Sequence, residues 1–280
     1  MTDYQTGTVV SADQTTIGFR ILGRGPAVVA VHGGMQAAQH LMQLGAALSA
    51  DFTVYLPDRR GRGLSGGHGE AYCADREAED LAAVVRAAGA HRIFGLSSGA
   101  LASLRTARDT PELDRVALYE PPLSVAGSVP VGWVDRYERE IAAGRTAAAL
   151  VTALKGIDVE PTFARTPRFI LTPLLRAGLR LQAAPPPGDV AAARLVPTQR
   201  YDMKLVREMA DTLDDYAALD AEVLLLGGGR SPRFLGQSLD ALSATLPRSR
   251  RVTYPDLGHS GPDNDGDPTR VAGTLREFFS

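Results

Sequence analysis

The stretch IFGLSSGALAS, residues 93–103, contains a G-x-S-x-G pattern centred on Ser97. The short apolar run Arg92–Leu96 before the serine predicts a strand, and the residues after it predict a helix. At such a strand–turn–helix junction a serine is held in a strained backbone conformation that exposes its hydroxyl above the carboxyl edge of a sheet. The alternative is an ordinary turn with a capping serine. We take Ser97 as the candidate nucleophile.

A second copy of the pattern is centred on Ser65, within PDRRGRGLSGGHGE, residues 57–70. This segment is polar and rich in glycine. No strand directly precedes Ser65 and no helix directly follows it, so the context that a nucleophile needs is missing. We therefore expect Ser65 to have a structural role.

Short apolar runs alternate with helix-like segments on both sides of residues 93–103. Their apolar, β-branched character is typical of strands that are covered on both faces. The sequence thus predicts an α/β fold with a mostly parallel central sheet and helices on both of its faces. The predicted strands are an edge hairpin (Thr6–Val10 and Thr15–Leu22) followed by Ala27–Val31, Thr53–Leu56, Arg92–Leu96, Val116–Tyr119, Glu222–Leu226 and Arg251–Tyr254.

The alternation stops between residues 121 and 219. This segment has a helical pattern interrupted by prolines, and it is too long for a structureless loop. We predict a helical cap over residues 121–219, inserted into a core domain that comprises residues 1–120 and 220–280. Trp133 and Tyr137 of the cap are the candidate substrate-binding residues.

Composition excludes several other classes of protein. The 280 residues carry a formal net charge of −2, which does not suit a general nucleic-acid binder. The single cysteine excludes a disulfide framework, and the five histidines form no metal-binding motif, so we expect neither a metal nor a cofactor. Without a signal peptide or a membrane-spanning run, the sequence predicts a cytoplasmic protein that acts on a small molecule and has no membrane or nucleic-acid partner.

Two further segments supply the groups that acyl transfer from a serine would need. The predicted strand Ala27–Val31 leads into His32-Gly33-Gly34, where a backbone amide can stabilise an oxyanion together with the amide of Ser98. Gly34 is the preferred donor and Met35 the second choice, while His32 is expected to brace the loop. His259 follows the last predicted strand, at the end of the sheet where a general base could reach Ser97.

These motifs together resemble the α/β-hydrolase superfamily. PDRRGRGLS, residues 57–65, is similar to the D-x-R-G-x-G-x-S loop of that superfamily, and HGG, GLSSG and the late GHS add to the resemblance. The resemblance covers the sheet-forming segments and does not extend into the cap. It implies an α/β-hydrolase fold, and it implies that Asp58 and Arg60 brace their loop.

The superfamily usually places its catalytic acid after the strand that follows the cap, where this chain has Arg230 and Ser231. Glu120 instead ends the strand Val116–Tyr119, a position where certain haloalkane dehalogenases carry their acid. We therefore expect Glu120 to contact His259, which gives the chain order Ser, acid, His. The alternative is a glutamate that forms hydrogen bonds at the entrance of the cap.

Three functions are compatible with these residues. The first is a serine hydrolase that cleaves an ester, thioester or lactone of a small, apolar molecule through a Ser97–His259–Glu120 triad. The second is non-hydrolytic chemistry at the same Ser-His site, such as elimination, carbon–carbon cleavage or cyclisation. The third is a binding protein without catalysis, which a missing acid would favour.

Overall fold

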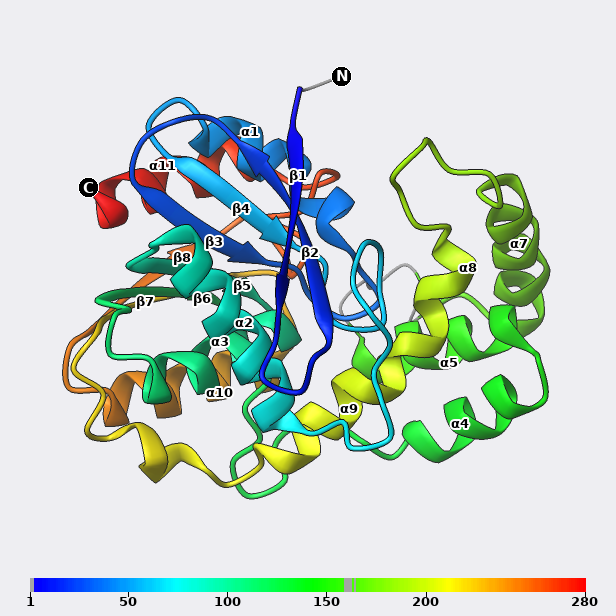
Figure 1. Ribbon diagram of the computed structural model, residues 1–280. Helices are drawn as coiled ribbons and strands as arrows, with labels where there is room; N and C mark the ends of the chain where they lie inside the picture. The colour runs from blue at the N-terminus through cyan, green and yellow to red at the C-terminus, as the bar shows by residue number, and fades with distance from the viewer. Residues whose placement is uncertain (1–2, 159–162, 164) are drawn as a thin grey trace.

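The computed structural model describes residues 3–158, 163 and 165–280, and its centre is one eight-stranded sheet (Figure 1). The strand order is β1-β2-β4-β3-β5-β6-β7-β8. The first two strands form the predicted antiparallel hairpin, β2 pairs antiparallel with β4, and all the other pairs are parallel. The strands are β1 Gln5–Val10, β2 Thr16–Leu22, β3 Ala27–Val31, β4 Thr53–Pro57, β5 Arg92–Leu96, β6 Arg115–Tyr119, β7 Glu222–Gly228 and β8 Ser249–Tyr254.

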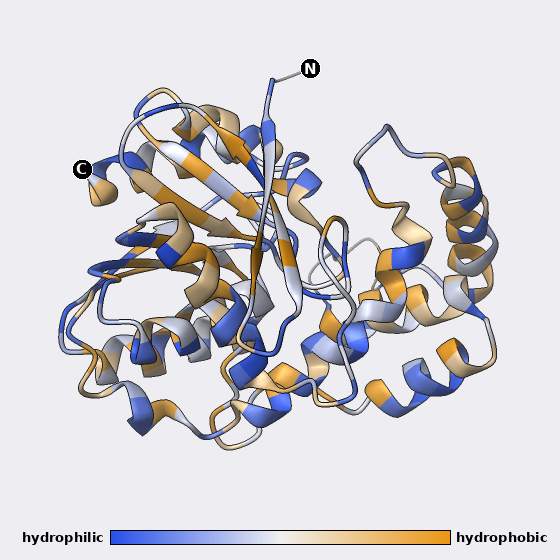
Figure 2. Ribbon diagram, viewed as in Figure 1, coloured by the Kyte–Doolittle hydropathy of each residue, from blue (hydrophilic) through white to orange (hydrophobic). Residues whose placement is uncertain are grey.

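Helices cover both faces of this sheet, as the unbroken apolar strands predicted. On one face α2 (Ala74–Ala88), α3 (Ser98–Asp109) and α10 (Arg233–Thr245) pack into one apolar core. On the other face α1 (Met42–Leu48) and α11 (Pro268–Phe279) form a second core. Figure 2 shows the apolar colour concentrated along the strands between these layers. The sheet is therefore buried on both sides, which is the usual condition for parallel strands.

Parallel strands bring the loops that follow them to a single edge of the sheet. Because β5, β6, β7 and β8 are consecutive neighbours, the residues after these four strands are close together although they are far apart in the sequence. β3 lies on the other side of β5, so the loop after it reaches the same edge. Ligands of open α/β sheets bind at this edge.

The inserted segment, residues 121–219, contains helices and no strand in its described part. Its helices lie together beside the sheet (Figure 1), and their own small core includes Tyr137, Ala149 and Val196. The helices are α4 Val134–Ala142, α5 Thr146–Ile157, α7 Arg168–Leu181, α8 Ala192–Leu195 and α9 Gln199–Glu208, with 3₁₀ turns at Val196–Thr198 and Leu213–Tyr216. A further 3₁₀ turn, Ala38–Leu41, precedes α1. Among the residues that the structure describes, no helix is both long and apolar enough to cross a bilayer.

Candidate active site

Ser97 occupies the sharp turn between β5 and α3. Its backbone has φ 55° and ψ −124°, a conformation that side-chain-bearing residues rarely adopt. The flanking glycines make the turn possible by their lack of a side chain. A Cβ on Gly95 would lie 2.5 Å from Cα of Ala100, and one on Gly99 would lie 2.2 Å from the carbonyl oxygen of His32. The strained backbone conformation is thus found at Ser97, as the strand–turn–helix context predicted.

His259 and Glu120 meet at the same edge of the sheet. Nδ1 of His259 donates to Oε2 of Glu120 at 2.6 Å, so the expected contact is present. The second carboxylate oxygen, Oε1, accepts from the backbone amide of Gly228 at 2.6 Å. Glu120 is 1% exposed and has a positive φ of 48°, which turns its side chain off the end of β6. Both oxygens of this buried carboxylate are therefore held by donors.

The end of β7 explains how the carboxylate can come from β6. Gly228, the last residue of β7, donates its backbone N–H to Glu120. At the position of the usual acid, the Arg230 amide donates to the carbonyl of Leu257 at 3.0 Å. β6 and β7 pair in register, with Tyr119 opposite Leu226. The two strand ends are thus adjacent, and the longer side chain of glutamate reaches across to the histidine.

The loop after β3 passes beside Ser97, since a Cβ on Gly33 would lie 3.2 Å from Cβ of Ser97. The Gly33 amide donates to Oε1 of Gln36 at 2.8 Å. The amides of Gly34 and Met35 donate to no acceptor within the described chain, and Met35 has a positive φ of 53°. These two amides are therefore free to bind an external oxygen, and the Ser98 amide starts α3 next to them.

His32 braces this loop, in agreement with its expected role. Its Nδ1 donates to the carbonyl oxygen of Gly33 at 2.9 Å, and its Nε2 accepts from the Arg59 amide at 3.2 Å. Burial holds the pKa of His32 well below its usual value, and the nearby charges of Arg62 and Arg59 lower it further. The neutral ring fits a group that donates at one nitrogen and accepts at the other.

The other motif residues of this region make structural contacts. Ser65 donates to the carbonyl oxygen of Asp58 and accepts from the Gly18 amide at 2.9 Å, which ties its loop to β2. The Asp58 carboxylate accepts from the amides of Ala38 and Leu64. Arg60 forms a two-point ion pair with Asp80 at 2.6 and 2.7 Å. The Ser65 hydroxyl therefore bonds to backbone groups and has a structural role, unlike the hydroxyl expected of Ser97.

A cavity of about 210 Å³ lies between the sheet edge and the inserted segment, and both Ser97 and His259 line it. Trp133 belongs to its lining, as expected of a candidate substrate-binding residue. Tyr137 does not, which corrects the expectation for that residue. Tyr137 is fully buried, its hydroxyl donates to the carbonyl of Val196, and its ring packs edge-on against Trp133. Tyr137 thus supports the lining from behind.

The lining is apolar over most of its extent, and none of its described residues is a lysine or arginine. Its apolar part comprises Met35, Leu96, Pro122, Val129, Pro130, Trp133, Leu154, Ile157, Met203, Val206, Phe234 and Leu235. Two carboxyl groups, those of Asp202 and Asp263, also belong to it. Within the described residues, no three His, Cys, Asp or Glu side chains are grouped so that they could hold a metal ion.

Sequence reasoning missed three charged residues around this cavity. Arg59 and Asp202 are each 1% exposed and pair with each other at 2.8 Å. Asp263 accepts from Gln36 at 2.8 Å, and burial raises its pKa to about 6. No local spacing marks Arg59 or Asp202, because the contact joins residues 143 positions apart. Only the position of Asp263, four residues after His259, could have drawn attention to it.

The fold, with a strained serine and a Glu-bound histidine on one cavity, defines a class of protein that comparison with known families identifies. The chain belongs to the alpha/beta hydrolase family, whose model matches residues 28–274. An alpha/beta hydrolase from Sphaerobacter thermophilus DSM 20745 has a similar structure, with 33% identity, a TM-score of 0.77, and coverage of 98% of this chain and 100% of that one. A search of the curated proteins found no match.

Two more distant structures are similar in fold. A thermophilic esterase from Thermogutta terrifontis is 24% identical with a TM-score of 0.70, and the match covers 98% of each chain. A meta-cleavage product hydrolase is 21% identical with a TM-score of 0.65, and the match covers 98% of this chain and 97% of that one. Because these two proteins carry out different reactions on one fold, the reaction of this chain has to be inferred from its own site.

Proposed function

We propose that this protein is a serine hydrolase that cleaves an ester, thioester or lactone of a small, neutral and largely apolar molecule. The observation that carries the proposal is the 2.6 Å contact between His259 and Glu120 at the cavity that Ser97 also lines. A histidine whose Nδ1–H is bound to a carboxylate presents Nε2 as an acceptor, which is the tautomer that a serine needs as its base.

In this mechanism the Ser97 hydroxyl attacks the carbonyl carbon while Nε2 of His259 takes its proton. The Glu120 carboxylate stabilises the imidazolium that forms. The amides of Ser98 and Gly34, with Met35 as the second choice for the latter, stabilise the oxyanion. His259 then protonates the leaving group, and water hydrolyses the acyl-enzyme by the same steps in reverse.

The cavity lining supports a neutral substrate. Asp263 adds a carboxyl group to its wall, whereas the charge of Asp202 is balanced by Arg59 and Arg62. None of the described lining residues is a lysine or arginine that could bind a carboxylate or phosphate. The many aliphatic and aromatic side chains favour an apolar group on the substrate. The third function compatible with the sequence, a binding protein without catalysis, is less well supported, because a carboxylate contacts His259.

The test uses a fluorophosphonate probe and p-nitrophenyl butyrate with the wild-type protein, Ser97→Ala and Ser65→Ala. We expect the probe to label Ser97, and Ser97→Ala to lower kcat by at least about 10³-fold with the melting temperature unchanged. Ser65→Ala should retain kcat within about threefold, because its hydroxyl bonds only to backbone groups.

Equal losses in the two variants, or labelling at another residue, would contradict the proposal. Labelling of Ser97 without turnover of any ester, thioester or lactone would instead favour the non-hydrolytic chemistry at the same site.

A further inference from the structure

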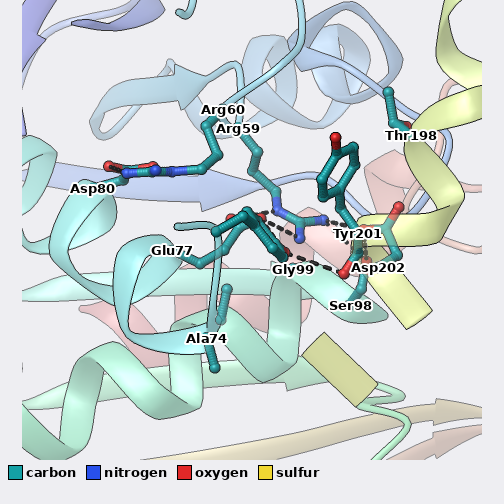
Figure 3. Close-up of polar contacts among 12 residues, drawn as sticks. Arg59, Arg60, Ala74, Glu77, Asp80, Ser98, Gly99, Thr198, Tyr201 and Asp202 are labelled. Atoms are coloured by element: carbon teal, nitrogen blue, oxygen red, sulfur yellow. Dashed lines mark hydrogen bonds and ion pairs between the residues drawn. The ribbon is translucent and has the colours of Figure 1, made fainter. Parts of the chain in front are cut away.

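The hydroxyl of Ser98, the residue after the candidate nucleophile, belongs to a buried ion network that includes the inserted segment. Its Oγ donates to Oδ1 of Asp202 at 2.8 Å and accepts from Nη1 of Arg59 at 3.0 Å. Figure 3 shows Arg59 reaching down from its loop between Glu77 and the Ser98–Asp202 pair. Asp202 lies on α9, while Ser98 begins α3. One hydrogen-bonded cluster thus joins the inserted segment to the turn that holds Ser97.

The charges of this cluster are balanced. Arg59 forms a two-point pair with Glu77, both contacts being 2.9 Å, and it also binds Asp202 at 2.8 Å. Arg62 binds the other oxygen of Asp202 at 2.6 Å. Burial alone would raise the pKa of Asp202, but the guanidinium groups of Arg62 and Arg59 outweigh it and hold the pKa below its usual range. Asp202 therefore stays ionised and can accept from Ser98.

Helix α9 also lies against the loop that carries Gly34, the second expected oxyanion donor. A Cβ on Gly34 would lie 2.8 Å from Oε1 of Gln199 and 3.3 Å from Cγ of Asp202. α9 therefore contacts the loop that carries the Gly34 amide and, through Asp202, the residue that carries the Ser98 amide. Both amide donors are positioned against a single element of the inserted segment.

We propose that Asp202 is a positioning residue, which holds Ser98 through its hydroxyl so that the Ser98 amide points at the developing oxyanion when α9 is seated. The inference rests on the proposed acyl transfer from Ser97. Oxyanion stabilisation depends on donors that are fixed before the reaction, so a donor that is free to tilt loses part of its effect. Asp202 acts on catalysis through Ser98 and needs no contact with the substrate.

The protein contains a matched ion pair that lacks this connection. Arg60 and Asp80 pair at 2.6 and 2.7 Å and are buried to a similar extent as Arg59 and Asp202. Arg60 directly follows Arg59 in the loop after β4, whereas Asp80 lies on α2. Figure 3 shows the Arg60 side chain directed away from Ser98, toward Asp80. A purely structural ion pair should therefore behave alike at the two places, whereas a positioning role should belong to Asp202 alone.

The experiment compares Ser98→Ala and Asp202→Asn with the controls Ser103→Ala and Asp80→Asn. Ser103 is a fully buried serine in the same helix whose hydroxyl donates to a backbone carbonyl. The readouts are kcat, KM and the inhibition constant Ki of a trifluoromethyl ketone, which forms a tetrahedral adduct with an oxyanion. Both test variants should lower kcat about 10-fold and raise Ki by the same factor, with KM within twofold. The controls should change none of the three.

Two results would overturn the proposal. One is Ser98→Ala with kcat and Ki within twofold of the wild type, and the other is a rise in KM alone, which would indicate a role in substrate binding. Equal losses in the controls and the test variants would likewise mean that the network is only structural. If Asp202→Asn does not fold, Ser98→Ala decides, because it leaves the charged pairs intact. A wild type that shows neither turnover nor labelling at Ser97 would overturn the proposed function, and this inference with it.

Discussion

Replacement of Glu120 by glutamine is the most direct test of how this site obtains its base. In the structure both partners of the Glu120 carboxylate are donors, namely Nδ1–H of His259 and the N–H of Gly228, each at 2.6 Å. Glutamine offers one oxygen and one NH₂ group in the same space. One of the two donors must therefore face another donor, or the histidine must change its tautomer.

The tautomer change is the less costly response. If the glutamine oxygen stays with His259, the buried Gly228 amide loses its acceptor, which costs about 1–3 kcal/mol. If the oxygen goes to Gly228, the histidine can satisfy the NH₂ group by accepting at Nδ1 and carrying its proton on Nε2. The ring then cannot accept a proton from Ser97. Loss of the equivalent carboxylate charge in a serine-protease triad lowers kcat about 10⁴-fold. For Glu120→Gln we expect kcat to fall by at least about 10²-fold.

The assay is kcat on p-nitrophenyl butyrate together with the melting temperature, and Asp256→Asn and Asp240→Asn serve as controls. Asp256 pairs with Arg270 at the surface, and Asp240, which is 70% exposed, pairs with Arg251. Both controls should retain kcat within about twofold. Turnover of Glu120→Gln within about threefold of the wild type would refute the reasoning, because the charge of Glu120 would then have no part in the reaction.

Four further substitutions probe the cavity and the core. Trp133→Ala should lower kcat/KM about 10-fold more for a bulky aryl ester than for p-nitrophenyl acetate, since its ring lines the cavity; equal losses on both esters would exclude this role. Burial raises the pKa of Asp263 from 3.8 to about 6, so the contribution of Asp263 to stability should fall as the pH rises from 4 to 6. Asp263→Asn should remove that contribution, so the variant should be about 3 kcal/mol more stable than the wild type at pH 8 and nearly equal to it at pH 4 in urea titrations. Gly99→Ala should lower the melting temperature strongly, because its Cβ would lie 2.2 Å from a backbone carbonyl, whereas Gly273→Ala in α11 should raise it slightly.

The sequence by itself predicted the strand order along the chain, the turn at Ser97 and the position of His259. These features depend on neighbours in the chain. Apolar runs of five residues predict strands, and a serine between Gly95 and Gly99 can adopt a strained turn whatever the rest of the fold does. The end of α2 is of the same kind, because Gly89 takes the left-handed conformation there, which a glycine adopts without steric cost.

Only the tertiary structure decided which distant side chains meet. Glu120 and His259 are 139 positions apart, and the resemblance suggested their contact but left a hydrogen bond at the cap entrance as the alternative. The contact depends on β6, β7 and β8 lying side by side in the sheet. Tyr137 is a second example in which the packing, and not the sequence, decided the position of a side chain. Its aromatic ring suited a binding residue, but the packing of the inserted helices turned it toward Val196 and away from the cavity.

The buried network of Arg59 and Asp202 has the same origin. A charge can be removed from water only where opposite charges and hydrogen bonds replace the lost solvation. Those partners come from α2, α3 and α9, so no local pattern marks either residue. Strand and turn preferences are set by sterics within a few residues, whereas the pairing of buried charges is set by which elements pack together.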